Sequence, residues 1–160
     1  MMIMKKGKKQ VKGFTLVELI VVIAIIGVLA AILIPSMLGY VNRAKMSGIN
    51  SSAKSLYNAA MAACRETDVV KPIPEGIFTK SSAPDGADAD LMRDYVYNYF
   101  DKAKEIVWGF RVEGDVVVGT CISKSADDQY VGTYPHPNNV RGPLGSDYEK
   151  YINFAQNGTW

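Results

Sequence analysis

The sequence predicts an α+β protein, in which one long N-terminal helix packs against an antiparallel sheet of three or four strands. Two observations lead to this fold class. An apolar stretch near the start continues as a helix-period pattern, and from Ile106 onward the apolar residues alternate with a period of two. A short second helix is expected in the region that connects these two parts.

The apolar stretch runs from Phe14 to Leu38 and is interrupted only by Thr15, Glu18, Gly27, Pro35 and Ser36. A helix needs about 20 mainly apolar residues to cross the hydrocarbon core of a bilayer, so residues 14–38 are predicted to span a membrane. A carboxylate inside such a segment costs about 2.5–3.5 kcal/mol at its centre. Membrane anchoring alone does not require Glu18, so we expect this residue to have a specific function.

Beyond this stretch the pattern becomes amphipathic, with apolar residues at Leu38, Val41, Ile49, Ala53, Leu56, Ala60 and Cys64. We expect one helix from about residue 14 to about residue 67, roughly 80 Å long, whose outer half has one apolar side for a folded domain. Pro35 removes a helical hydrogen bond and is expected to bend the helix, which Gly27 and Gly39 also weaken.

The connecting region is predicted to contain a loop and then a helix. Residues 69–89 are rich in Pro, Gly, Ser and Asp, which is typical of an exposed loop. Asp90 is expected to cap a second helix, from Leu91 to about Lys104, whose apolar side includes Tyr95 and Tyr99.

A hairpin is predicted around Gly114-Asp115, a dipeptide typical of a two-residue turn between strands. Counting outward from this turn, Phe110 lies opposite Gly119 and Trp108 lies opposite Cys121. These four residues would share the uncharged face that packs on the long helix.

Two further strands are expected, over Gln129–Tyr134 and around Tyr151–Phe154. The tail after Pro135 is rich in turn residues. We expect this tail, like the loop at 69–89, to form exposed surface.

The charge of the chain is concentrated in its first residues. The 160-residue chain has 18 basic and 16 acidic residues, and five lysines precede Gly13. Without them 13 basic residues face 16 acidic ones, a net charge of −3. The basic balance thus belongs to the leader and gives no reason to expect nucleic-acid binding. It also predicts that the leader stays cytoplasmic and the rest of the chain lies outside.

The letters Gly13-Phe14-Thr15-Leu16-Val17-Glu18, after a lysine-rich leader and before the apolar stretch, resemble the prepilin signal of type IV pilins. Pseudopilins of type II secretion systems share this signal. The resemblance covers roughly residues 5–65. It implies that a prepilin peptidase cuts after Gly13 and then N-methylates Phe14. It also implies three segments: a cleaved leader (1–13), a membrane and assembly segment (14–38), and an extracellular pilin domain (39–160).

By the same resemblance, the chain is the structural subunit of a filament that polymerises through its apolar helix. It would be stored in the cytoplasmic membrane as prepilin and monomer and then enter a cell-surface filament, with roles in adhesion, motility or DNA uptake. Its partners would be other copies of itself, the peptidase, an assembly platform and a motor ATPase. Glu18 would pair with the new amino terminus at Phe14 of a neighbouring subunit, and the helix would loosen near Gly27 and Pro35.

Several alternatives stay open. Within the family, the chain could be a pseudopilin of a secretion system. Outside it, the chain could be a membrane-anchored extracellular module that binds carbohydrate or DNA. An ordinary secretory signal explains neither the length of the apolar stretch nor Glu18, and an uncleaved anchor does not explain Glu18. Surface fibres would favour the pilus subunit.

Cys64 and Cys121 are the only cysteines, and both lie in the segment expected outside the membrane, where disulfides persist. On the predicted register they point toward each other from the helix and the sheet. Two interpretations stay open: the two cysteines form a disulfide, or they are buried free thiols that pack in the core.

No catalytic constellation is apparent, so we expect neither an enzyme nor a cofactor. His136 has no evident metal partners, and a metal site is not expected. The acidic turns at Asp127-Asp128 and Asp147–Glu149 leave calcium as a minor alternative, since some pseudopilins have a calcium loop near their C-terminus.

Overall fold

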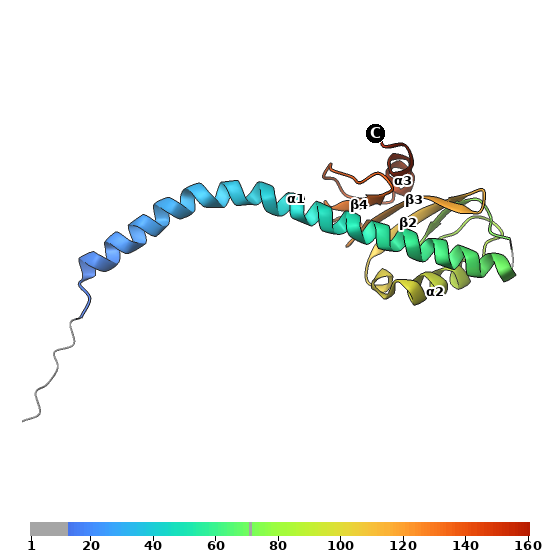
Figure 1. Cartoon of the computed structure of the whole chain (residues 1–160), viewed down its shortest axis with the longest axis horizontal. Helices are drawn as coiled ribbons and strands as arrows, with labels where there is room; N and C mark the ends of the chain where they lie inside the picture. The colour runs from blue at the N-terminus through green and yellow to red at the C-terminus, as the bar shows by residue number, and fades with distance from the viewer. Residues whose placement is uncertain (1–12, 71) are drawn as a thin grey trace, which may run out of the picture. The chain divides into compact units, whose positions relative to one another are not determined.

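The computed structural model describes residues 13–70 and 72–160 (Figure 1). Along the chain it contains α1 (Leu16–Val70), β1 (Gly76–Thr79), α2 (Ala89–Tyr99), a 3-10 helix η1 (Asp101–Lys104), β2 (Val107–Glu113), β3 (Val116–Ser123), β4 (Val131–Tyr134) and α3 (Tyr148–Asn157). The predicted α+β class, with a long first helix, is confirmed.

The chain divides into two units, which meet after Tyr40. The described part of the first unit consists of the early part of α1 and the residues just before it. The second unit, Val41–Trp160, contains the rest of α1, the sheet and the other helices. It holds the buried core of the protein.

The sheet is antiparallel throughout, with its strands in the order β1-β2-β3-β4. The predicted hairpin and the strand near residue 130 are confirmed, but the loop predicted at 69–89 contains β1. Phe78 of this strand is buried and stacks on Phe110 of β2, with ring centroids 5.2 Å apart. One aromatic side chain inserted into the core thus orders a segment whose composition is otherwise typical of a loop.

The second helix is shorter than predicted and begins earlier. Asp88, not Asp90, caps α2 by accepting a hydrogen bond from the backbone N–H of Leu91. Met92 and Val96 are its buried residues, whereas Tyr99 is exposed. The last part of the predicted helix forms η1 instead.

The face of the sheet that meets α1 is very close to the helix backbone. If Gly132 of β4 had a side chain, its Cβ would lie 2.3 Å from the carbonyl oxygen of Ile49. Thr120 donates to the carbonyl of Ala53 at 3.1 Å, and the side chain of Asn50 accepts from the backbone N–H of Thr133 at 3.0 Å. Helix and sheet are therefore joined by backbone contacts as well as by apolar packing.

A β-bulge corrects the predicted register. Next to the turn, Val112 lies opposite Val117 as expected, but Arg111 then lies opposite Gly119 because Val118 is an extra residue in β3. The predicted pairs Phe110–Gly119 and Trp108–Cys121 were therefore wrong. From the bulge onward each residue of β3 lies on the face opposite to the one predicted.

The last element is also corrected, because residues near Tyr151 form helix α3 and not a strand. Asp147 caps its start by accepting from the backbone N–H of Lys150, and Gly158 ends it in the left-handed conformation, with φ 73°. α3 covers the face of the sheet opposite α1, where Ile152 and Cys121 belong to a second buried cluster (Figure 1).

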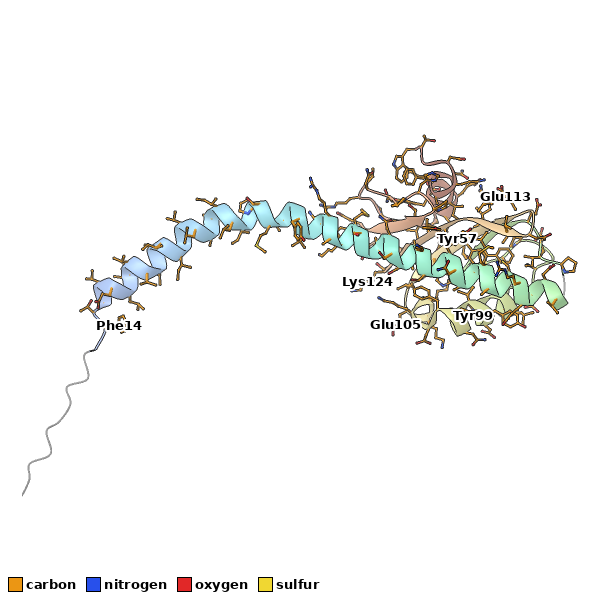
Figure 2. All side chains as sticks on the ribbon, viewed as in Figure 1. Phe14, Tyr57, Tyr99, Glu105, Glu113 and Lys124 are labelled. Atoms are coloured by element: carbon orange, nitrogen blue, oxygen red, sulfur yellow. The ribbon has the colours of Figure 1, made fainter. Side chains whose placement is uncertain are left out.

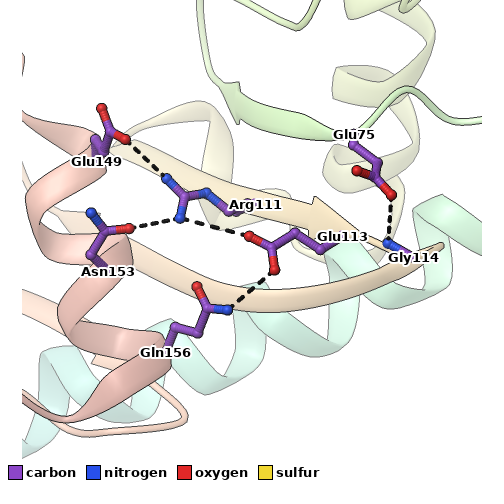
Figure 3. Close-up of polar contacts among 7 residues, drawn as sticks. All are labelled: Glu75, Arg111, Glu113, Gly114, Glu149, Asn153 and Gln156. Carbon is purple, nitrogen blue, oxygen red and sulfur yellow. Dashed lines mark hydrogen bonds and ion pairs between the residues drawn. The ribbon is translucent and has the colours of Figure 1, made fainter.

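A polar network connects α3 to strand β2 of the sheet (Figure 3). Arg111 donates to Asn153 at 2.6 Å and lies 3.4 Å from a carboxylate oxygen of Glu149. Gln156 donates to Glu113 at 3.2 Å. Because these partners extend from both strand and helix, the network fixes where α3 lies along the sheet.

We predict that Gly132→Ala lowers the free energy of unfolding of this domain by about 3 kcal/mol, since the new methyl group would overlap the α1 backbone. Gly48→Ala is the matched control: nothing lies within 4 Å of its Cβ position, and alanine favours a helix by about 0.5–1 kcal/mol. Urea unfolding of the detergent-solubilised chain, followed by the fluorescence of buried Trp108, measures both. Equal stability of Gly132→Ala and the parent would contradict the close contact.

Candidate functional site

The candidate site is the first part of α1, whose apolar surface is uncovered. Its Leu, Ile, Val and Met side chains between Leu16 and Leu38 are 50–73% exposed. Figure 2 shows these side chains projecting all round the helix. Soluble monomers rarely expose contiguous apolar patches above a few hundred Å². This surface therefore requires lipid or other apolar helices around it.

Among the described residues, α1 is the one helix that is long and apolar enough to span a membrane. Its most apolar window is not buried at all within the chain. The helix of a soluble core would have been covered, so the exposed surface agrees with the predicted membrane segment.

Thr15 and Glu18 form a capping box at the start of the helix. Glu18 Oε2 accepts from the backbone N–H of Thr15 at 2.8 Å and from its hydroxyl at 2.7 Å, while Thr15 Oγ1 accepts from the N–H of Glu18 at 3.3 Å. Thr-x-x-Glu before an apolar run is the known sequence pattern of a capping box, so the sequence contains the signal for this local role, which was not among the predictions. Oε1 forms no hydrogen bond with a described residue, so the carboxylate retains an acceptor for a partner outside the chain.

The predicted processing site lies on exposed backbone before α1. Phe14 is 90% exposed, and nothing lies within 4 Å of the Cβ position of Gly13. No packing in the described chain thus explains a glycine here, and a peptidase could reach the bond between them. The rest of the predicted leader, residues 1–12, lies outside the described residues.

The residues expected to weaken the helix all lie within continuous α1. The helix is unbroken at Gly27, Pro35 and Gly39, and both glycines face open space. Beside the proline, the hydroxyl of Ser36 donates to the carbonyl of Ile32 at 3.3 Å. The expected loosening at these residues stays a prediction.

Cys64 and Cys121 are free thiols in this structure, and both are buried. Cys64 belongs to the core between α1 and the sheet, whereas Cys121 belongs to the cluster under α3. The expectation that Cys121 points toward α1 was wrong, because the bulge in β3 turns it to the other face. The geometric reason for a disulfide is thereby removed.

The acidic turns and His136 have structural roles. Asp128 accepts from the N–H of Tyr130 at 3.0 Å, Asp147 caps α3, and a ring nitrogen of His136 lies 2.9 Å from the carbonyl oxygen of Ala155. Within the described ranges, no group of three or more His, Cys, Asp or Glu side chains is placed to hold a metal ion.

Comparison with known proteins identifies the N-terminal region. The family described as "Prokaryotic N-terminal methylation motif" matches residues 8–34. The type IV major pilin protein PilA of Myxococcus xanthus is 46% identical over 57 residues, which are 36% of this chain and 26% of that protein. In this region the chain therefore resembles type IV pilins and their prepilins.

Other relatives differ in how much of this chain they match. The fimbrial protein EcpC of Eikenella corrodens is 65% identical over 40 residues, which are 24% of this chain and 26% of the relative. A fimbrial protein of Neisseria meningitidis is 29% identical over 121 residues, covering 66% of this chain and 69% of its own length. No solved structure gives a significant match. The matches to PilA and EcpC thus span only about a quarter of each relative's length and leave most of the domain beyond Val41 uncovered.

We predict that neither cysteine of the folded chain reacts with iodoacetamide at pH 8. Burial, with a smaller contribution from the charges of Asp115 and Asp68, raises the pKa of Cys64 to about 12. Burial also raises the pKa of Cys121, against the opposing effect of a hydrogen bond with the Gly109 backbone. The reactive thiolate is therefore scarce at both positions.

Mass spectrometry measures how much label each cysteine takes up. Folded chain and chain unfolded in urea are compared, both without reductant. Both thiols are expected to react once the chain unfolds. A chain that takes up label only after reduction contains the disulfide, and a folded chain that is labelled at once does not bury its thiols.

Proposed function

We propose that this chain is the structural subunit of a type IV pilus-like filament, made as a prepilin and assembled through its apolar helix. The peptidase would remove residues 1–13 and methylate Phe14, leaving residues 14–38 as the membrane and assembly segment and 39–160 as the extracellular domain. The observation that carries the proposal is the uncovered apolar surface of α1, most of which lies within the region that the methylation motif matches.

An apolar helix surface can be solvated equally by lipid tails and by the side chains of other helices. Packing between helices in lipid gains little from the hydrophobic effect, because both environments are apolar. A subunit could thus leave the membrane for a bundle of similar helices at little cost. Such a bundle would form the core of the filament.

Glu18 supplies the specificity that apolar packing lacks. Cleavage after Gly13 creates a positive amino group at Phe14, and the Oε1 acceptor of a neighbour's Glu18 could bind it. Four residues of helix correspond to about 6 Å of rise, so this pair would set the axial offset between two parallel subunits. Breaking a buried charge pair by removing one partner costs about 3–5 kcal/mol, enough to select one register.

Assembly of this kind needs machinery that the chain does not contain. By family, the peptidase, an assembly platform and a motor ATPase would act on it. The chain would reside in the cytoplasmic membrane as prepilin and monomer and at the cell surface as filament. The family consists of structural proteins, and we assign the chain no catalytic activity.

The relatives named above are pilus or fimbrial proteins, which favours a pilus over the pseudopilin of a secretion system. Roles in adhesion, motility or DNA uptake would depend on the surface of the domain and are compatible with the same filament. An isolated anchored module that binds carbohydrate or DNA would need the apolar surface only to lie in lipid, and would have no use for a carboxylate at Glu18.

We predict that Glu18→Gln is processed and inserted in the membrane but is depleted at least about 100-fold from surface filaments, as expected for a loss of about 3 kcal/mol. Glutamine can still occupy a capping box, so this variant removes the charge and keeps the helix start. Immunoblots of sheared filaments and of membranes measure the two pools. Filaments of normal amount from Glu18→Gln would contradict the charge pair.

Thr15→Ala is the matched control, since it removes the capping hydroxyl and retains the carboxylate. It is expected to assemble to within a few-fold of the parent. If Thr15→Ala fails as badly as Glu18→Gln, helix capping and not charge pairing explains the defect.

We predict that Gly13→Leu remains as full-length, unmethylated prepilin in the membrane, because a bulky side chain before the cut blocks an extended backbone in a protease cleft. The parent should give an N-terminal peptide that begins with methylated Phe14. Mass spectrometry of the membrane fraction distinguishes them, and an unchanged N-terminus in Gly13→Leu would show that the cut lies elsewhere.

A further inference from the structure

Cations without carboxylate partners surround a groove in the Val41–Trp160 unit. The groove has a volume of about 580 Å³ and lies between α1 and the loop after β4. Arg43 and Lys54 line it from the helix and Arg141 from the loop, and no acidic side chain is among its lining residues. Positive charge is therefore gathered here, although beyond residue 40 the chain has 13 basic and 15 acidic residues.

Two of the three groove cations, Lys54 and Arg141, lie over aromatic rings, as does Lys45 beside the groove. Lys45 lies 5.4 Å and Arg141 5.7 Å from the ring centroid of Tyr130, and Lys54 lies 5.8 Å from that of Tyr134. Among the described residues, the salt bridges involve only other cations. The rings favour positions of Lys54 and Arg141 beside the groove, and no carboxylate of the described residues pairs with either side chain.

Negatively charged side chains gather at the C-terminal end of α1. Glu66 and Asp68 lie on its last turns. Asp88 lines a small pocket together with Thr67, and Asp85 lies three residues before Asp88 in the chain. All four are exposed. Asp68 and Asp85 form no hydrogen bond or ion pair with any described residue, so this acidic end also has unused charge.

Within one chain the two regions cannot neutralise each other. Both lie on the same helix, and the 19 residues from Gly48 to Thr67 correspond to about 28 Å of rise. Screening reduces interactions between exposed charges beyond about 8 Å at physiological salt. The structure thus holds complementary charges apart on one rigid body.

We propose that the basic groove of one copy binds the acidic end of another copy. Two different, complementary surfaces on one body make a heterologous contact, which yields a ring if it closes and a helical polymer if it does not. The inference deepens the proposed function by giving the outer domains a contact of their own. With parallel helices it joins copies offset by about 28 Å, a different neighbour from the one offset by about 6 Å through Glu18.

Charge reversal tests the contact in the full chain. Arg43→Glu with Lys54→Glu, and separately Asp68→Lys with Asp85→Lys, should each lower sheared filaments about 10-fold while the membrane pool stays unchanged. The four changes combined should restore filaments to within about 2-fold of the parent. Such rescue is not expected if each residue acts only within its own chain.

The matched control is Lys102→Glu with Lys124→Glu, which makes the same change in net charge at exposed positions outside the groove. It should assemble like the parent. A combined variant that is as defective as either pair alone overturns the proposal, and the groove then serves a different anionic partner.

A second measurement does not depend on filament yield. A zero-length carbodiimide reagent joins an amine to a carboxylate in direct contact, and a mixture of ¹⁵N-labelled and unlabelled full chains identifies links between copies. A link from Lys54 to Asp68 or Asp85 between copies is expected in concentrated membranes. If that link forms where no filaments do, the contact stands and the proposed function fails; if filaments form without it, the contact is overturned.

Discussion

Water exclusion from the first part of α1 is the constraint on which the rest of this protein depends. Exposing an apolar helix to water on every side is unfavourable, so the helix must be surrounded either by lipid or by other apolar helices. Both environments satisfy it without distinguishing one axial position from another. In the assembly proposed above, the few polar groups on or beside this surface, above all Glu18, would decide how copies are arranged.

The second constraint is that the same helix must also hold a folded domain. The domain is built on small residues, because Ala53, Ala60 and Gly132 let the sheet approach the helix backbone closely. The hydroxyl of Thr120, which donates to Ala53, and the side chain of Asn50, which accepts from Thr133, add directional contacts to this packing. One helix thus has two parts. The first part is apolar on all sides, and the second buries only the side that packs against the domain.

The sequence predicted the long helix, its two-part character, the hairpin and the candidate site, because periodicity and the Gly-Phe-x-x-x-Glu pattern are local signals. It did not predict the bulge after Val117, which depends on how Gly119 fits beneath α3. The error for Cys121 followed directly from that bulge. Helix α3 was missed although its caps, Asp147 and Gly158, stand in the sequence, and the groove cations were missed because Arg141 joins them only through the fold.

The continuity of α1 from Leu16 to Val70 has a mechanical consequence. In a filament built as proposed, tension would pass along the helices and through the contacts between them. The sheet follows α1 in the chain and contacts it from the side, so it would lie outside the load path. Loops on the far face of the sheet, or on α3, could then change in sequence and length without weakening the fibre, and the strength of the filament would be separated from the chemistry of its surface.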